Sequence, residues 1–468
     1  MTDSHDTHRS AQRALSRRSF LKLGGGAALG LAAGGATYAL SRGWNPARLM
    51  AAPQAADQQM HIAVTDGYIT LPGRPAPNDL YVFGFKEIPW SHTPQQAASL
   101  HKGKVQMTSP IIGVDQEDEF HLKVSNLGLQ VRPDLDDAHT VHWHGFRNPI
   151  PVFDGVPRMS LAIPVGRSYT YVFIPHDPGT YIYHCHFEDV EHVQMAMIGI
   201  VYVRPEQNYT AGDDGLPQAR LAGNTDPDAP MGYAYNDGDG STAYDREFSI
   251  LLTEIDERPH DLLATVQEFI WARYDPQYWT LNGRAYPDTI APNGTSDPAT
   301  GELTAPVGHP DLEFQPISSL VQANAGERVL LRLGHLGYQQ HAMQLAGIPM
   351  RVVGHDATLM RGPDDDEADL TYWTNEVYLA PSVTRDVIFQ APAFDPSAPV
   401  RTDGVGDYNV YYFKNRNYAR LNNGGQPGPG GMMTEVRIYD GTLPQQVQGH
   451  QIFTGPATAQ RPERRTLT

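Results

Sequence analysis

The chain has 468 residues, with 44 glycines, 38 prolines and a formal charge of −18. Its length predicts two or three domains. The net negative charge argues against nucleic acid as a partner, since a phosphate backbone is bound by basic patches. One cysteine, Cys185, against 19 histidines excludes an intrachain disulfide framework, a CxxC redox pair and a Cys-rich zinc site.

Residues 1–40 are predicted to be a targeting segment, separate from the fold. Ser16-Arg-Arg-Ser-Phe-Leu-Lys22 is a twin-arginine (Tat) signature, and a Gly- and Ala-rich apolar stretch runs on to Leu40. That stretch is marginal as a spanning helix. We therefore expect export to the periplasm, or secretion, with no stable membrane anchor.

Short strands separated by turns are predicted from Met60 to about Arg204. Runs rich in Thr, Tyr, Val and Ile, bounded by Gly, Pro and Asp, indicate a sandwich or barrel. The clearest of these runs are 119–125, 168–174 and 181–183.

A turn-rich stretch then separates this half from a second β-rich half. The second half contains predicted strands at 248–253, 328–333, 350–353, 386–390 and 434–439. Only the stretch around Asp261–Ala272 indicates a helix, and Asp364–Glu367 indicates a solvated loop. The expected fold is all-β, with two Greek-key sandwich domains. The expected boundaries are 60–205 for domain 1, 206–245 for the linker, 246–441 for domain 2 and 442–468 for a polar tail.

Histidines gather around the only cysteine in two short motifs, His139-Thr-Val-His-Trp-His144 and His184-Cys-His186. Successive residues of a strand point to opposite faces. We therefore expect His142 and His144 to share one face, and His139 to serve a different site. Likewise, His184 and His186 are expected on one face and Cys185 on the other.

Strand alternation thus predicts two ligand sets. Cys185, His139 and His192, with Met197 as a long axial thioether, make the donor set of a blue-copper electron-transfer site. The second set holds only imidazoles, which suits copper that meets oxygen; it consists of His142, His144, His184 and His186. Cys185 lies between two members of the second set, which gives electrons a short through-bond path.

Other interpretations fit this pattern less well. A lone buried cysteine is usually packing, but two HxH pairs around the only cysteine are hard to explain that way. Zinc rarely uses one Cys with a methionine beside it. A Cys–His nucleophile has no need for so many histidines.

These motifs resemble the multicopper oxidases, the laccase-like enzymes built from cupredoxin domains. The resemblance is close in residues 139–204 and rests on four motifs: His142-Trp-His-Gly, Phe153-Asp-Gly-Val-Pro, Pro164-Val-Gly-Arg-Ser-Tyr-Thr-Tyr and Gly179-Thr-Tyr-Ile-Tyr-His-Cys-His. It implies that His139, Cys185 and His192 are the catalytic type 1 ligands, with Met197, and that the other four histidines belong to a type 2/type 3 cluster. There, four electrons from a small-molecule reductant would convert O₂ to water.

The chain departs from the family pattern in two places. The gap from Cys185 to His192 is two residues longer than usual. In the second half, His341-Ala-Met-Gln344 and Lys414-Asn-Arg416 stand where the family has its other HxH motifs. A trinuclear cluster needs eight histidines, and four are apparent. We expect structural roles for the spare histidines His335, His341 and His355.

Two further functions therefore stay open. The layout also resembles the copper nitrite reductases, although these have an Asp where His142 stands here. Alternatively, the protein is a non-enzymatic type 1 copper electron carrier or copper-binding protein with a degenerate second domain. Short two-domain multicopper oxidases and copper nitrite reductases both assemble as trimers. A homotrimer is therefore compatible with a resemblance to either family.

Overall fold

The computed structural model describes residues 58–446, apart from 76–78, 148, 211–214, 266–267, 298 and 363–367. The expected targeting segment, most of the expected tail and the acidic run Asp364–Glu367 lie outside these described residues. Within them, no helix is long and apolar enough to cross a membrane.

The first half of the described chain forms two four-stranded sheets. One has the order β2-β1-β4-β6 and the other β3-β8-β7-β5. Their bounds are β1 (Gln58–Thr70), β2 (Asp79–Ile88), β3 (Ile112–Asp115), β4 (Phe120–Asn126), β5 (His142–His144), β6 (Ser168–Phe173), β7 (Gly179–His184) and β8 (Ile198–Arg204).

The second half forms two larger sheets. One has the order β12-β11-β16-β22-β18-β19 with β20 beside β18, and the other β15-β25-β24-β17-β21 with β23 beside β24. Their bounds are β11 (Arg246–Ile255), β12 (Tyr278–Leu281), β15 (Val321–Asn324), β16 (Arg328–His335), β17 (His341–Leu345), β18 (Met350–His355), β19 (Thr358–Leu359), β20 (Tyr372–Thr374), β21 (Glu376–Leu379), β22 (Val383–Gln390), β23 (Val400–Thr402), β24 (Asp407–Asn415) and β25 (Met433–Tyr439). Two small strand pairs, β9 (Gly232–Tyr233) with β10 (Ala243–Tyr244) and β13 (Thr295–Ser296) with β14 (Leu303–Thr304), lie outside these sheets.

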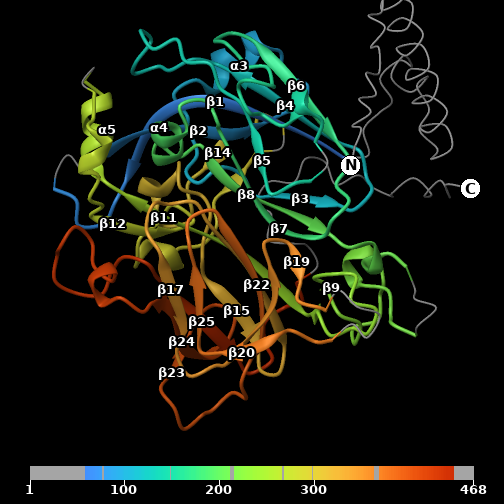
Figure 1. Ribbon diagram of the computed structural model, residues 1–468. Coiled ribbons are helices and arrows are strands. Elements are labelled where there is room, and N and C mark those ends of the chain that lie inside the picture. The colour runs from blue at the N-terminus through green and yellow to red at the C-terminus, as the bar shows by residue number, and fades with distance from the viewer. Residues whose placement is uncertain are drawn as a thin grey trace, which may run out of the picture. The chain divides into compact units, whose positions relative to one another are not determined.

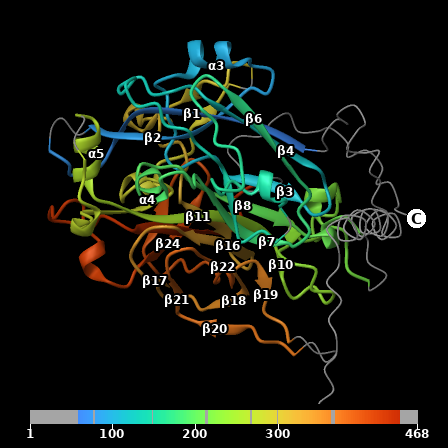
Figure 2. The same ribbon diagram turned by 45° about the horizontal axis from the view of Figure 1, so that its top comes forward.

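Three apolar cores join the four large sheets. The first lies between the two first-half sheets and includes Trp143 and Tyr183. The second joins the halves, because Ile182 and Ile200 of the first half pack with Leu251 of the second. The third fills the second-half sandwich. Figures 1 and 2 show the first-half strands, blue to green, stacked on the second-half strands, yellow to red. The predicted all-β class is confirmed.

Helices are few, and their prediction was partly wrong. The helix expected around Asp261–Ala272 is α5 (Glu257–Leu263), which begins earlier because the Asp256 side chain accepts the Arg258 N–H. Trp271–Arg273 is only a 3₁₀ turn. Two further helices, α3 (Pro94–His101) and α4 (Asp189–Gln194), were not predicted. The other 3₁₀ turns are Pro151–Phe153, Glu206–Asn208, Arg220–Ala222, Asp288–Ile290, Pro310–Leu312 and Tyr418–Arg420.

Candidate metal centres

Strand β7 is buried on both faces, and its alternation separates two groups of ligands. Tyr183 points into the first-half core, whereas Ile182 points to the core between the halves. By strand alternation, His184 lies on the same face as Ile182. Cys185 lies on the same face as Tyr183, in the first core. On the neighbouring strand β5, Trp143 occupies the same core and His142 pairs with His184. Adjacent residues therefore serve opposite faces of one sheet.

The first group consists of Cys185, His139 and His192, all buried, with ligand atoms within 4.8 Å of one another. The Cys185 Sγ atom lies 3.3 Å from His192 Nδ1 and 3.8 Å from His139 Nδ1. Metal–nitrogen and metal–sulfur bonds of about 2.1 and 2.3 Å meeting near the tetrahedral angle span roughly 3.6 Å. The three atoms thus have the separation that one shared ion requires.

The charges of this group also fit a metal ion. Burial lowers the pKa of His192 to about 4 and that of His139 well below its usual value, so both imidazoles are neutral with free lone pairs. Burial raises the pKa of the Cys185 thiol to about 12. A bound cation reverses this effect because it stabilises the thiolate directly. The Thr140 N–H also points at Sγ, at 3.4 Å.

Met197 is held beside this group by its backbone. Its N–H donates to His192 O at 2.9 Å, and its carbonyl accepts the Cys185 N–H at 3.1 Å. Its side chain is fully buried in the same apolar core as Cys185. The segment from Cys185 to Met197 is therefore one loop closed by backbone hydrogen bonds, with α4 in its middle.

The second group consists of His142, His144 and His184, whose ligand atoms also lie within 4.8 Å of one another. His142 Nδ1 donates to Asp154 O at 2.7 Å, and His184 Nδ1 donates to Cys185 O at 2.8 Å. These bonds place the hydrogen on Nδ1 and the lone pair on Nε2 of both rings. His184 Nε2 lies 3.4 Å from His144 Nδ1, a separation at which the two nitrogens could share one metal ion. Burial lowers the pKa of all three histidines, that of His184 to about 3.

His186 lies at the edge of the second group. Its ring centroid is 5.1 Å from that of His142 and 5.6 Å from that of His184. Its N–H donates to Thr140 Oγ1 at 3.1 Å, while Thr140 N–H points at Cys185 Sγ. Thr140 therefore links the backbone of the second group to the sulfur of the first.

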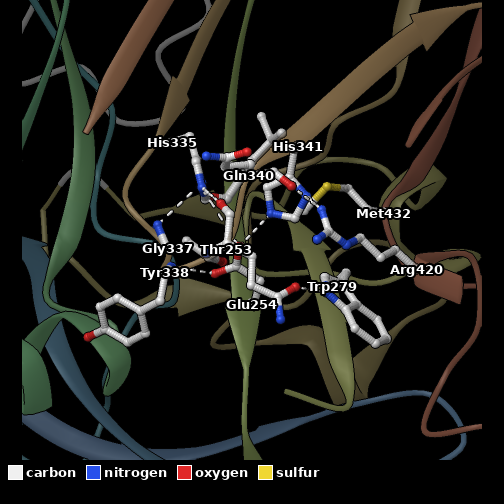
Figure 3. Close-up of polar contacts among 12 residues, drawn as sticks. Thr253, Glu254, Trp279, His335, Gly337, Tyr338, Gln340, His341, Arg420 and Met432 are labelled. Atoms are coloured by element: carbon white, nitrogen blue, oxygen red, sulfur yellow. Dashed lines mark hydrogen bonds and ion pairs between the residues drawn. The ribbon is translucent and has the colours of Figure 1, made fainter. Parts of the chain in front are cut away.

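Two of the spare histidines, His335 and His341, form a third buried group with Glu254 (Figure 3). His341 Nε2 lies 2.5 Å from Glu254 Oε1, and Tyr338 N–H donates to Oε2 at 2.9 Å. Burial opposes the charge of Glu254. The hydrogen bond from His341 and the neighbouring imidazoles nevertheless hold the pKa of its carboxyl below the usual range.

The donors around His341 determine its protonation. Arg420 Nη1 and Asn415 Nδ2 lie 2.7 and 2.8 Å from His341 Nδ1, and both can only donate. His341 Nδ1 is therefore the acceptor, and Nε2 carries the proton that is donated to Glu254. His335 Nε2 likewise donates to Gln339 O at 2.5 Å. Both imidazoles are satisfied without a metal, which supports structural roles.

Sequence reasoning missed Glu254 and Arg420, since neither lies in a recognisable motif. Asn415 lies in Lys414-Asn-Arg416, the segment that stands where the family has an HxH motif, but its contact with His341 was not predicted. The third spare histidine, His355, lies at the end of β18, where its Nε2 is 3.0 Å from Asp356 Oδ2. His355 is about half exposed and belongs to none of the three groups.

Comparison with known proteins agrees with the ligand motifs. Residues 88–208 match the model of the multicopper oxidase family. Copper is the metal that the family implies. Over 59 residues the chain is 49% identical to copper resistance protein A of Pseudomonas syringae pv. tomato, covering 12% of this chain and 10% of that protein.

Over 83 residues it is 36% identical to laccase-1 of Cryptococcus neoformans var. neoformans serotype D, covering 17% of this chain and 12% of the laccase. The chain thus matches only about a tenth of the length of these curated relatives. Among solved structures, blue copper oxidase from Nitrosomonas europaea shares the fold, with a TM-score of 0.54 and 20% identity over 81% of this chain and 86% of that one.

Proposed function

We propose that the protein is an exported copper oxidoreductase. Cys185, His139 and His192, with Met197, would hold a type 1 copper that accepts electrons from a small-molecule reductant. His142, His144, His184 and His186 would hold a second copper centre, with O₂ as the final electron acceptor. The observation that supports this most is the arrangement of His184, Cys185 and His186, in which consecutive residues belong to two separate donor groups.

The donor chemistry of each group supports its role. A thiolate with two imidazoles and a methionine favours electron transfer, and an all-imidazole group with open positions favours a copper that meets oxygen. Copper bound at both groups supplies one-electron redox chemistry. The chain itself buries the thiol of Cys185, keeps the imidazoles neutral and turns the His142 and His184 rings by their Nδ1 hydrogen bonds.

The second half contributes structure more than ligands to this proposal. Its sequence contains no HxH pair, and His335 and His341 already have partners for their ring nitrogens. The second centre is therefore proposed to rest on the four first-half imidazoles. The Tat signature supports export, and changing Arg17 and Arg18 to Lys should leave the protein in the cytoplasmic fraction.

Oxygen uptake by the copper-loaded full chain tests this function. With a phenolic reductant, we expect one O₂ consumed for every four electrons removed, and no uptake by the Cys185→Ser variant. His121→Gln is the matched control, because His121 is bonded to Glu119 at 2.8 Å and belongs to neither group. Turnover with nitrite alone, or blue colour without any turnover, would overturn the proposal in favour of a reductase or a carrier.

A further inference from the structure

Helix α4 has one side towards the second half of the chain and the other towards Cys185. Val190, Val193 and Gln194 occupy positions i, i+3 and i+4, so they lie along one side of the helix. His192 lies on the opposite side, where its Nδ1 is 3.3 Å from Cys185 Sγ. Whatever holds the first side of α4 therefore also places the His192 imidazole.

The first two contacts on this side come from the segment that follows β16. The Tyr338 hydroxyl donates to the Val190 carbonyl. The Val193 side chain packs with Leu336 in the apolar core that joins the two halves. Glu254 fixes the segment in turn, because its carboxylate accepts the Tyr338 N–H at 2.9 Å (Figure 3).

Gln194 makes the third contact, and it is buried at the end of α4. Its Nε2 donates to Glu254 O and to His260 Nε2, each at 3.2 Å. His260 accepts at Nε2 because its Nδ1 donates to Tyr81 O at 2.7 Å, and because burial lowers its pKa to about 4, which keeps the imidazole neutral. A single amide group thus ties α4 to both β11 and α5 of the second half.

We propose that the second half positions His192 beside Cys185, through the contacts of Gln194 and Tyr338 with α4. The inference rests on the proposed function, because it concerns the copper that Cys185 and His192 would bind. Gln194 and Tyr338 are positioning residues, which act through the helix. The buried group around Glu254 thereby gains a role, since its carboxylate holds the Tyr338 segment and its carbonyl accepts from Gln194.

Fixing His192 has a consequence for the electron affinity of the centre. A thiolate with two imidazoles forms a trigonal donor set, whereas Cu²⁺ favours tetragonal arrangements. An imidazole held by α4 resists the shift towards a tetragonal arrangement. The contacts of Gln194 and Tyr338 should therefore disfavour the oxidised state and make the centre a better electron acceptor.

Hydrogen exchange in the metal-free, full-length protein tests the contacts without copper. In the Gln194→Leu/Tyr338→Phe variant, the backbone N–H groups of residues 191–197 should exchange about tenfold faster or more, because buried hydrogen bonds that hold the helix are lost. Tyr274→Phe is the matched control, since the Tyr274 hydroxyl donates to the same Glu254 carbonyl at 3.4 Å. Unchanged exchange in the double variant, or an equal increase in Tyr274→Phe, would overturn the inference.

The reduction potential and EPR spectrum of the copper-loaded protein test the effect on the centre. In the double variant, the equilibrium with a one-electron reference couple should shift about tenfold towards the oxidised protein, which is about 59 mV, and the copper hyperfine splitting should change. Tyr274→Phe should match the wild type in both. If the wild type is blue and the double variant keeps its potential and spectrum, this inference alone fails. If the copper-loaded wild type is not blue, the proposed function fails, and the inference fails with it.

Discussion

Glu254 is the residue on which the buried group of the second half depends. It accepts from His341 at 2.5 Å, lies 3.7 Å from His335 Nε2 and receives two backbone N–H groups from Tyr338 and Gln339. Arg420 supplies the positive charge at the far side of His341. The group is a charge-balanced hydrogen-bond network with no vacant ligand atom on His341.

The Glu254→Gln variant should lower the free energy of unfolding by about 1 to 3 kcal/mol, because the buried carboxylate oxygens accept from His341 Nε2 and from two backbone N–H groups, and an amide has only one oxygen to replace them. Its copper content should not change, since no copper is assigned to this group. Urea unfolding and metal analysis measure both quantities, with exposed Glu302→Gln as the control. Loss of copper in the Glu254 variant would show that the group is a metal site after all.

The sequence motifs predicted the two histidine groups of the first half, but they did not predict the buried group around Glu254. Strand parity is a local property, so the separation of Cys185 from His184 follows from the sequence alone. Glu254, His341 and Arg420 are 87 and 79 residues apart along the chain. Only the packing of two sheets against each other, together with the 3₁₀ turn Tyr418–Arg420, brings them together, and no short motif records it.

At the scale of elements, a buried polar contact joins β7 of the first half to β16 and β22 of the second. Arg332 Nε donates to Glu247 at 2.9 Å, and its guanidinium lies 3.7 Å from Asp386. Asp386 in turn accepts from Thr180 Oγ1 at 2.5 Å. Arg332, Glu247 and Asp386 are all buried, so each charge depends on its partners.

We expect Arg332→Met to destabilise the fold by about 3 to 5 kcal/mol, because the buried carboxylates of Glu247 and Asp386 both lose this cation. The double variant Arg332→Met/Glu247→Met should recover part of that loss, since only Asp386 then keeps a charge without Arg332. A double-variant cycle in urea measures the coupling. Additive losses would mean that the two residues stabilise the fold independently.

The strands were predicted far better than the helices. The predicted runs for β4, β6, β11 and β22 begin and end within a few residues of the observed strands. Helix α4 has only six residues, and it lies in a loop that the backbone hydrogen bond between Cys185 and Met197 closes. Such a turn depends on tertiary contacts, which a periodicity argument does not include.

At the scale of the whole molecule, buried neutral histidines make stability depend on pH. Burial lowers the pKa of His61 to about 3 and that of His260 to about 4. In the unfolded chain both titrate near 6.5, so the unfolded state binds more protons below that pH. Stability should therefore fall as the pH drops from 6.5 towards 4, by up to about 1.4 kcal/mol per pH unit for each group.

Urea midpoints of the metal-free protein between pH 7.5 and 4.5 measure this effect. His61 bridges Pro89 O and Ser125 Oγ, and it lies in neither first-half ligand group. In the His61→Gln variant, stability should fall less steeply as the pH drops, because one proton fewer is taken up on unfolding. Parallel pH profiles for the two proteins would contradict the assignment of His61.

The proposed binding of copper by two groups on opposite faces of one sheet is tested most directly by counting copper. Metal analysis with visible and EPR spectra should find at least two coppers per chain in the wild type. Cys185→Ser should lose one copper together with the blue band, and His142→Gln/His184→Gln should lose the remainder but stay blue. One copper per chain in the wild type, or a blue band that survives Cys185→Ser, would contradict the account.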